Sequence, residues 1–323
     1  MIGVILLNLG GPDSIDAVRP FLYNLFSDRD IIRLGPSFLQ KPIAALIIGM
    51  KLRKTLAAYN LIGGKSPLFD ITSAQAKALE ENLNVTAAPD QAKFRVYVGM
   101  RYWHPFTEES LGQMHAEGIS KIIALSLYPH YSVATTGSSI KHFKNAAAKY
   151  SFEYSCITSW FNHPLYIDAL VAQIETGLKS FDTKPAVLFS AHSLPQKFVT
   201  SGDPYVNEIR GTIDTLTKRL DLQWSLSYQS KTGPVKWLEP STGQMLYELA
   251  GKGIKDLLVV PISFVSDHIE TLYEIDILYK SLAKNLGITL RRTESLNTSP
   301  KFIEALADIV LKKVADSGWI DLP

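Results

Sequence analysis

Eight short apolar runs alternate along the chain with longer segments of helical periodicity. The runs lie at residues 4–8, 95–101, 122–128, 154–158, 186–190, 224–229, 257–262 and 288–292. Short buried strands that alternate with helices are typical of parallel sheets with right-handed crossovers. The sequence therefore predicts an α/β fold of two doubly wound, Rossmann-like halves, each with a four-stranded parallel sheet flanked by helices.

The division between the halves is expected near residues 159–165, where Trp160, Phe161 and Pro164 interrupt the periodic pattern. This gives an N-terminal domain of residues 1–160 and a C-terminal domain of residues 161–323. The last helical segment, residues 300–316, belongs to neither sheet by its pattern. We expect it to pack across both halves.

Composition excludes several classes of protein. The chain has 323 residues, of which 46% are hydrophobic, and its net charge is only +2. A disordered or fibrous chain is excluded, and a nucleic-acid partner is not expected from so mild a charge. The one cysteine, Cys156, excludes an internal disulfide framework and a cysteine-only metal cluster, and favours a reducing compartment. The N-terminus lacks a basic region and reads as the first strand, not as a signal peptide.

A single histidine, His192, follows the apolar run that ends at Ser190. Ligands of open α/β sheets bind beyond the carboxyl ends of the strands, and a histidine there can take or pass a proton near neutral pH. A structural histidine is the alternative. The sequence places His192 in the loop after the strand and predicts a role in proton transfer.

An acidic segment follows the run at residues 257–262. On an α-helix Asp267, Glu270 and Glu274 would form one carboxylate stripe, with His268 on another face. The spacing differs from the H-E-x-x-H pattern of a tightly held zinc. A solvated helix face would normally carry lysines as well, and none occurs between Asp267 and Tyr279. The stripe therefore favours a path for loosely held divalent metal or for protons.

Aromatic and polar residues gather where the first three strands are expected to end. They include Arg101, Tyr102, Trp103 and Tyr131. Such a wall suits a flat apolar ligand with anionic edges, because rings stack on rings and an arginine pairs with the charges. Closure of the hydrophobic core is the alternative explanation for each ring.

Residues 36–54 combine apolar side chains with flanking lysines and arginines. The uncharged stretch is far shorter than the roughly 20 residues that a membrane-spanning helix needs. Two interpretations stay open: an amphipathic helix packed on the core, or an interfacial helix that contacts a bilayer surface.

Taken together, these motifs resemble the ferrochelatase family, whose members insert ferrous iron into a porphyrin at the end of haem synthesis. The matching segments are residues 6–12 (LLNLGGP), 59–67, 100–105, 128–139, 189–195 (FSAHSLP), 202–205 (GDPY), 228–234 (YQSKTGP) and 264–276. They cover nearly the whole chain in order. The resemblance implies a chelatase-like fold and a lyase that metallates a porphyrin.

The resemblance implies five metal-handling residues in the C-terminal half. His192 matches the family's active-site histidine, which lies on one face of the porphyrin and either accepts the pyrrole protons or binds iron. Glu270 matches its partner across the macrocycle, so both are expected to be catalytic. Asp267, His268 and Glu274 match the acidic helix that conducts metal or protons. The family's next carboxylate position is Leu278 here, so the outer path is expected to be shorter or differently routed.

The resemblance also implies five substrate-binding residues in the N-terminal half. Tyr59 and Ser66 match residues that hold a propionate, and Leu9, Arg101 and Tyr131 match pocket positions. Because the Leu9 position is commonly tyrosine in relatives that metallate coproporphyrin III, the aliphatic residue favours protoporphyrin IX. The alternatives are a coproporphyrin III ferrochelatase and a non-catalytic porphyrin or haem carrier.

No tightly bound cofactor is expected, since ferrous iron is a substrate. The cysteine-rich extension that holds a [2Fe–2S] cluster in animal relatives does not occur in this sequence. The absence of a transit peptide favours a bacterial cytoplasmic enzyme. The resemblance adds the expectation that residues 36–54 contact the inner face of the plasma membrane peripherally. The sequence predicts neither the oligomeric state nor the iron donor.

Overall fold

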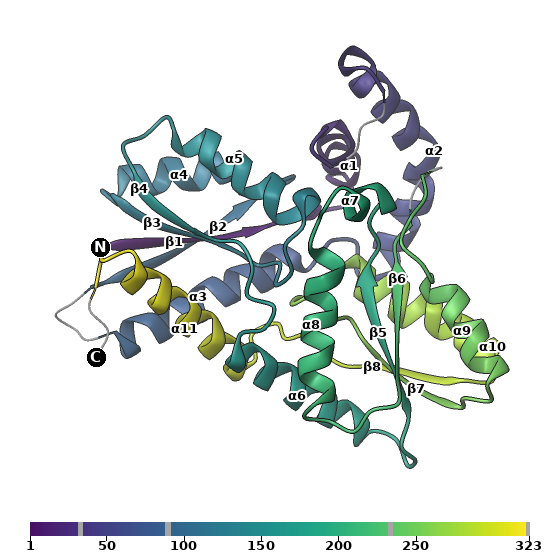
Figure 1. Cartoon of the computed structure of the whole chain (residues 1–323). Coiled ribbons are helices and arrows are strands. Elements are labelled where there is room, and N and C mark those ends of the chain that lie inside the picture. Colours follow the sequence, from purple (N-terminus) through teal and green to yellow (C-terminus); the bar gives the residue numbers. More distant parts are fainter. Residues whose placement is uncertain (32–34, 88–91, 232–234, 321–323) are drawn as a thin grey trace. The chain divides into compact units, whose positions relative to one another are not determined.

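Two four-stranded parallel sheets carry the fold, as the alternation of apolar runs predicted (Figure 1). The computed structural model describes residues 1–31, 35–87, 92–231 and 235–320. The chain divides into unit 1, Met1–Trp160 with Asn297–Pro323, and unit 2, Phe161–Leu296. Of the segments that carry the family resemblance, only residues 232–234 lie outside the described residues.

The sheet of unit 1 has the strand order β2-β1-β3-β4. Its strands are β1 (Ile2–Asn8), β2 (Phe94–Met100), β3 (Lys121–Ser126) and β4 (Glu153–Ile157). Every residue of β1 is buried, because helices cover both faces of the sheet. The predicted strand positions are correct to within one or two residues.

Helices of unit 1 lie on the two faces of this sheet, α3 and α11 on one and α4 and α5 on the other (Figure 1). The helices of unit 1 are α1 (Val18–Ser27), α2 (Gln40–Leu61), α3 (Leu68–Thr86), α4 (Thr107–Ala116), α5 (Ser138–Ala147) and α11 (Pro300–Asp316), with a short 3₁₀-helix η1 (Ser37–Leu39) and a short π-helix η2 (Val133–Gly137). One core cluster joins Ile5 and Ile122 of the sheet to Leu111 of α4 and Phe143 of α5.

Unit 2 repeats the same topology with the order β6-β5-β7-β8. Its strands are β5 (Ala186–His192), β6 (Trp224–Gln229), β7 (Asp256–Val260) and β8 (Thr289–Arg292). Its helices are α6 (Pro164–Leu178), α7 (Gln196–Thr200), α8 (Tyr205–Thr217), α9 (Thr242–Gly251), the π-helix η3 (Glu270–Tyr279) and α10 (Lys280–Asn285). Its core cluster packs Leu188 and Val259 of the sheet against Leu246 of α9 and Ile275 of η3.

The last helix is part of unit 1 and not of the C-terminal half. Residues 297–323 belong to unit 1, so the predicted C-terminal domain of residues 161–323 is too long. Helix α11 lies against α3, and its Phe302 ring is 6.0 Å from the Trp160 ring. The helix buries a wide apolar stripe there. The sequence predicts this stripe but not the sheet against which it packs.

Candidate active site

His192 is the last residue of β5 and not, as expected, a loop residue, since it pairs in register with Gln229 of β6. Its backbone is fixed on both sides. The His192 N–H donates to Ser263 Oγ over 2.9 Å, and the Tyr205 hydroxyl donates to the His192 carbonyl over 3.0 Å. A strand end held in this way fixes where the imidazole points.

The carboxylate of Glu270 pairs directly with His192. Glu270 Oε2 lies 2.8 Å from His192 Nδ1, and the side chains are 16% and 33% exposed. A macrocycle has no room between atoms at this distance, so the expectation that Glu270 faces His192 across the porphyrin is wrong. The carboxylate raises the pKa of His192 against the lowering effect of burial, and His192 is the main group that lowers the pKa of Glu270 to about 2 despite burial.

Ser230 connects Glu270 to a second carboxylate, Glu274. The Ser230 hydroxyl is 2.7 Å from Glu270 Oε2 and 2.6 Å from Glu274 Oε2. Ser230 has a positive φ of 67°, a conformation that costs energy in a residue other than glycine and often marks a functional site. Gln229 Nε2 donates to Glu274 Oε2 over 3.2 Å, and Ser190 holds the Gln229 amide oxygen.

The pKa values of Glu270 and Glu274 differ widely. Burial, followed by the charge of Glu270, raises the pKa of Glu274 to about 7. Glu270 is therefore ionised near neutral pH, while Glu274 binds and releases a proton there. When Glu274 is protonated, its hydroxyl donates to Ser230 and the Ser230 hydroxyl donates to Glu270. The contacts then form one chain from Glu274 through Ser230 and Glu270 to His192.

His268 lies beside this chain. Its Nδ1 is 3.0 Å from the carbonyl of Ser266, so Nδ1 carries the proton and Nε2 the lone pair. Nε2 is 3.9 Å from Glu270 Oε1, and the Phe264 ring packs edge-on against His268 with 4.4 Å between centroids. Burial lowers the pKa of His268, which keeps the ring neutral.

Asp267 does not join the expected carboxylate stripe. Its Oδ1 accepts hydrogen bonds from Thr271 and Ser295 and lies 3.0 Å from Nη1 of Arg292. The helix that follows is a π-helix, so the α-helical spacing behind the stripe does not apply. The stripe is therefore reduced to Glu270 and Glu274.

The five predicted metal-handling residues do not form a closed coordination site. Among the described residues, no three His, Cys, Asp or Glu side chains are arranged to hold one metal ion. Asp267 is held by an arginine, and His268 is held by a backbone carbonyl.

Replacing Glu274 by glutamine is expected to flatten the dependence of stability on pH. The folded-state pKa of Glu274, about 7, lies above the ordinary value of 4.5. Its contribution to stability is therefore full below about pH 4.5 and is lost as the pH rises through about 7. The difference in Tm between pH 5 and pH 8 should be smaller in Glu274→Gln than in the parent, with the exposed Glu248→Gln as control. An unchanged difference would mean that Glu274 titrates normally.

Three of the predicted substrate-binding residues lie near the carboxyl ends of β1 and β2. The N–H of Arg101 donates to the Asn8 carbonyl, and the N–H of Tyr102 donates to the carbonyl of Leu9. The Ser66 N–H donates to the Pro12 carbonyl over 2.7 Å. A side chain at Gly11 would lie 2.5 Å from the Ser66 hydroxyl, so the Gly10-Gly11 turn is what lets the buried Ser66 approach β1.

Tyr59, Arg101 and Tyr131 are placed differently from one another. Tyr59 is buried near the end of α2, and Tyr131 follows β3 with its hydroxyl against Gly137. Arg101 Nη2 lies 2.6 Å from Asp28 Oδ2, so its charge is already paired. Arg101 also lines a cavity of about 570 Å³ in unit 1 that the other four substrate-binding positions do not line.

Comparison with known proteins decides the family. The family model described as ferrochelatase matches residues 1–314. The chain belongs to the ferrochelatase family. Curated ferrochelatases from Geotalea uraniireducens and Synechocystis are 54% and 47% identical to it; the alignments cover 97% and 98% of this chain and 98% and 83% of the relatives. The family and these relatives make the chain a metal chelatase of haem synthesis.

Solved structures show that the ferrochelatase fold of this chain is shared more widely. SirB from Bacillus subtilis with Fe³⁺ matches with a TM-score of 0.58 at 12% identity, over 100% of this chain and 99% of that one. CbiX, described as the terminal enzyme of sirohaem biosynthesis in denitrifying bacteria, matches with a TM-score of 0.51 at 10% identity, over 96% and 98% of the two chains. At these identities the likeness concerns the fold alone.

Two residues that contact the candidate site were not named as site residues from the sequence. Ser230 bridges the two carboxylates and Arg292 holds Asp267. Ser230 follows β6, which neighbours β5, and the carboxyl ends of adjacent parallel strands meet at one edge. That rule could have indicated Ser230. Arg292 ends the edge strand β8, and its sequence shows nothing that points to Asp267.

Proposed function

We propose that this protein inserts ferrous iron into protoporphyrin IX and that His192 is the base that removes the pyrrole protons. The observation that carries the proposal is the His192–Glu270 pair at 2.8 Å. Glu270 accepts from Nδ1, which fixes the tautomer and leaves the lone pair on Nε2. Within the described residues His192 Nε2 makes no hydrogen bond, so it can accept a proton from a ligand.

The carboxylate of Glu270 also suits the removal of the pyrrole protons by His192. Two N–H protons leave the porphyrin as its four nitrogens bond to the iron and the iron loses its water. When Nε2 takes a proton, a positive imidazolium forms beside the negative Glu270, which stabilises it. One imidazole alone binds a metal weakly, which favours a base over an iron ligand.

Glu274 provides the exit for each proton. Its pKa of about 7 lets it accept a proton and release it to water near neutral pH. Ser230 links its carboxylate to Glu270, so a proton can leave along the hydrogen-bonded chain before His192 acts on the second N–H. Because the proton that leaves is the one on Nδ1, the ring keeps its new proton on Nε2. A flip of the imidazole then turns its unprotonated nitrogen toward the second N–H.

Recognition of the porphyrin is assigned to unit 1. Ser66 and Tyr59 are proposed to hold a propionate, and Leu9, Arg101 and Tyr131 to contact the ring or its edges. Leu9 is half-buried and cannot donate a hydrogen bond from its side chain. An aliphatic side chain fits the vinyl-bearing edge of protoporphyrin better than a further propionate of coproporphyrin, because an unpaired charge beside it would lose hydration.

An anaerobic absorption assay with ferrous iron, offering each porphyrin separately, tests this proposal. We expect catalytic turnover with a higher kcat/KM for protoporphyrin IX than for coproporphyrin III. Preference for coproporphyrin III would contradict the use of Leu9 and keep the chelatase. Tight binding of either ring without metallation would contradict the chelatase and identify a carrier.

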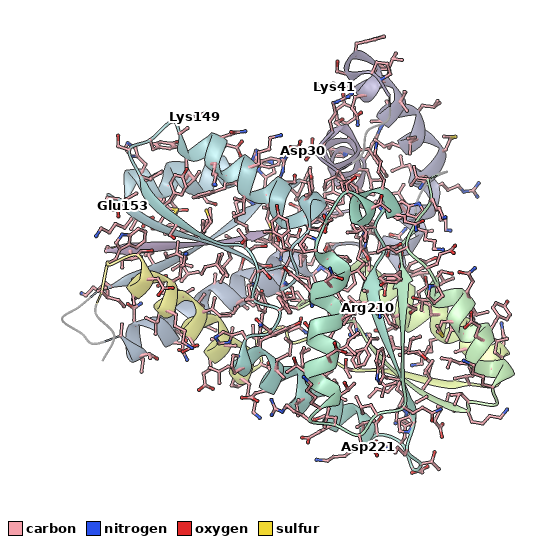
Figure 2. All side chains as sticks on the ribbon, in the orientation of Figure 1. Asp30, Lys41, Lys149, Glu153, Arg210 and Asp221 are labelled. Atoms are coloured by element: carbon pink, nitrogen blue, oxygen red, sulfur yellow. The ribbon has the colours of Figure 1, made fainter. Side chains whose placement is uncertain are left out.

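We further propose that η1 and α2 contact an anionic bilayer. Phe38, Leu46 and Met50 are 76%, 65% and 70% exposed, while only a narrow stripe of α2 is buried. Lys41, at the beginning of α2, is labelled in Figure 2, and Lys54 lies in the second half of the helix. No helix in the described part of the chain is long and apolar enough to cross a membrane. Apolar side chains beside cations suit shallow insertion into a surface instead.

Sedimentation with vesicles of mixed phosphatidylglycerol and phosphatidylcholine measures this contact. Burying one large apolar side chain contributes about 1.5 kcal/mol, so Leu46→Ser with Met50→Ser should weaken binding about tenfold or more. Val85, which is 85% exposed on α3, provides the control Val85→Ser. Equal binding of parent and double variant would contradict the contact.

A further inference from the structure

Arg292 pairs with two carboxylates, Asp267 and Asp276. In the sequence they lie on either side of Glu270 and Glu274. Arg292 Nε and Nη2 donate to the two oxygens of Asp276 over 2.9 and 2.8 Å, and its Nη1 lies 3.0 Å from Asp267 Oδ1. Asp267 precedes Glu270, and Asp276 follows Glu274. A single guanidinium therefore fixes the chain before Glu270 and after Glu274.

The geometry demands this side chain in particular. Asp267 and Asp276 are nine residues apart, which would span about 13.5 Å along a straight α-helix. Here both carboxylates reach one guanidinium, because Asp267 lies before the helix and the following turns belong to a π-helix. Arginine offers a planar fork with five donors, whereas lysine offers a point charge.

Burial makes the interaction strong. The Arg292 side chain is 10% exposed, and Asp267 and Asp276 are 17% and 34% exposed. The remaining Arg292 contacts are the Thr293 carbonyl at 3.0 Å and the Ser295 hydroxyl at 3.5 Å. Removing one partner of a buried ion pair leaves an uncompensated charge. The carboxylates and the arginine therefore stabilise one another only as a set.

Arg292 also balances the charge of Asp267, the residue that precedes His268. The charge of Asp267 acts on the His268 ring. That ring lies 3.9 Å from Glu270. The titratable groups around His192 are Glu270, Glu274 and His268 from the segment that contains η3, and Tyr205 from α8. With Arg292 present, the charge of Asp267 is neutralised, and Glu270 is the carboxylate that governs His192.

We propose that Arg292 is a positioning residue for metallation: it tethers the acidic π-helix through Asp267 and Asp276, so that Glu270 and Glu274 stay in register with His192 and Ser230. The role rests on the proposed function of His192 and Glu270. It assigns Asp267 and Asp276 to the anchor of the helix and not to the path of the metal.

Three measurements on Arg292→Gln test the tether, with the exposed neighbour Arg291→Gln as control. We expect amide exchange of residues 267–279 in the substrate-free protein to accelerate about tenfold or more. The acid limb of kcat/KM and the NMR titration of His192 should move to higher pH, because the freed negative charge of Asp267 favours the imidazolium. Loss of such a supporting contact should lower kcat/KM for ferrous iron about 10- to 100-fold.

Conservative variants separate charge from geometry. Arg292→Lys should restore the His192 titration while leaving exchange of residues 267–279 faster than in the parent. Asp276→Asn should accelerate amide exchange of residues 267–279 without raising the pKa of His192. If Arg292→Gln does not fold, this variant alone tests the tether. Parent-like exchange in Asp276→Asn would overturn the tether.

Other outcomes also overturn the proposal. Faster exchange in Arg292→Gln with unchanged kinetics and His192 titration would make Arg292 purely structural, and equal effects of Arg291→Gln would remove its specificity. If the parent metallates no porphyrin, the proposed function fails by itself. The tether is then decided by exchange and by the His192 titration, which need no substrate.

Discussion

Replacing His192 by alanine is expected to lower kcat for porphyrin metallation by about 10²- to 10⁴-fold, the usual contribution of a positioned general base. The imidazole is a third exposed at the end of β5, where its removal leaves the strand pairing intact. The protein should therefore fold, with a lower Tm because the largely buried Glu270 loses its ion-pair partner. Initial rates with ferrous iron, measured under anaerobic conditions, give the size of the loss.

His115→Ala is the matched control for this variant. His115 is exposed on α4 and packs against the rings of Tyr150 and Phe152, away from any residue assigned to the site. It should retain parental kcat. If His192→Ala retained more than about a tenth of the parental kcat, general-base catalysis by His192 would be refuted.

Glu270→Gln is expected to produce the second largest loss, about 10²- to 10⁴-fold in kcat/KM, as when a catalytic histidine loses its orienting carboxylate. The carboxylate raises the pKa of His192. Without it that pKa falls, so the imidazole stays neutral at lower pH. The acid limb of the kcat/KM profile should thus shift to lower pH while its plateau drops.

A pH profile across the neutral range separates this effect from a loss of folding. The exposed Glu248 on α9 gives the control Glu248→Gln, which should leave the profile unchanged. A Glu270→Gln profile with a lower plateau but an unmoved acid limb would mean that Glu270 does not set the titration of His192.

The sheets could be predicted because buried parallel strands leave a local signature. Runs such as residues 257–262 are apolar on both faces, and helical segments separate them. The packing of α11 could not be predicted in the same way. Its apolar stripe suits any sheet face, and only the three-dimensional position of α3 and Trp160 selects unit 1.

The sequence does not by itself distinguish the important histidine from a buried one. His130 follows β3 much as His192 ends β5. Burial lowers the pKa of His130 to about 3, so that ring stays neutral. His192 differs because Glu270, distant in sequence, faces it. The family resemblance singled out His192, but the spacing of residues could not give its contact with Glu270.

The relation between the acidic residues was the least predictable part of the site. The spacing of Asp267, Glu270 and Glu274 suits an α-helical stripe, whereas the structure has a π-helix. Long-range contacts separate these carboxylates: Ser230 links Glu270 to Glu274, and Arg292 pairs with Asp267. Local periodicity carries no information about such contacts.

The central claim, that His192 serves as the base and not as the iron ligand, is tested most directly by one anaerobic titration. Ferrous iron is titrated into parent and His192→Ala protein by calorimetry, and the absorption spectrum of bound protoporphyrin IX is followed in the same samples. We predict the same iron affinity in both proteins and loss of porphyrin deprotonation in the variant. Loss of iron binding with deprotonation retained would contradict the account and make His192 the metal ligand.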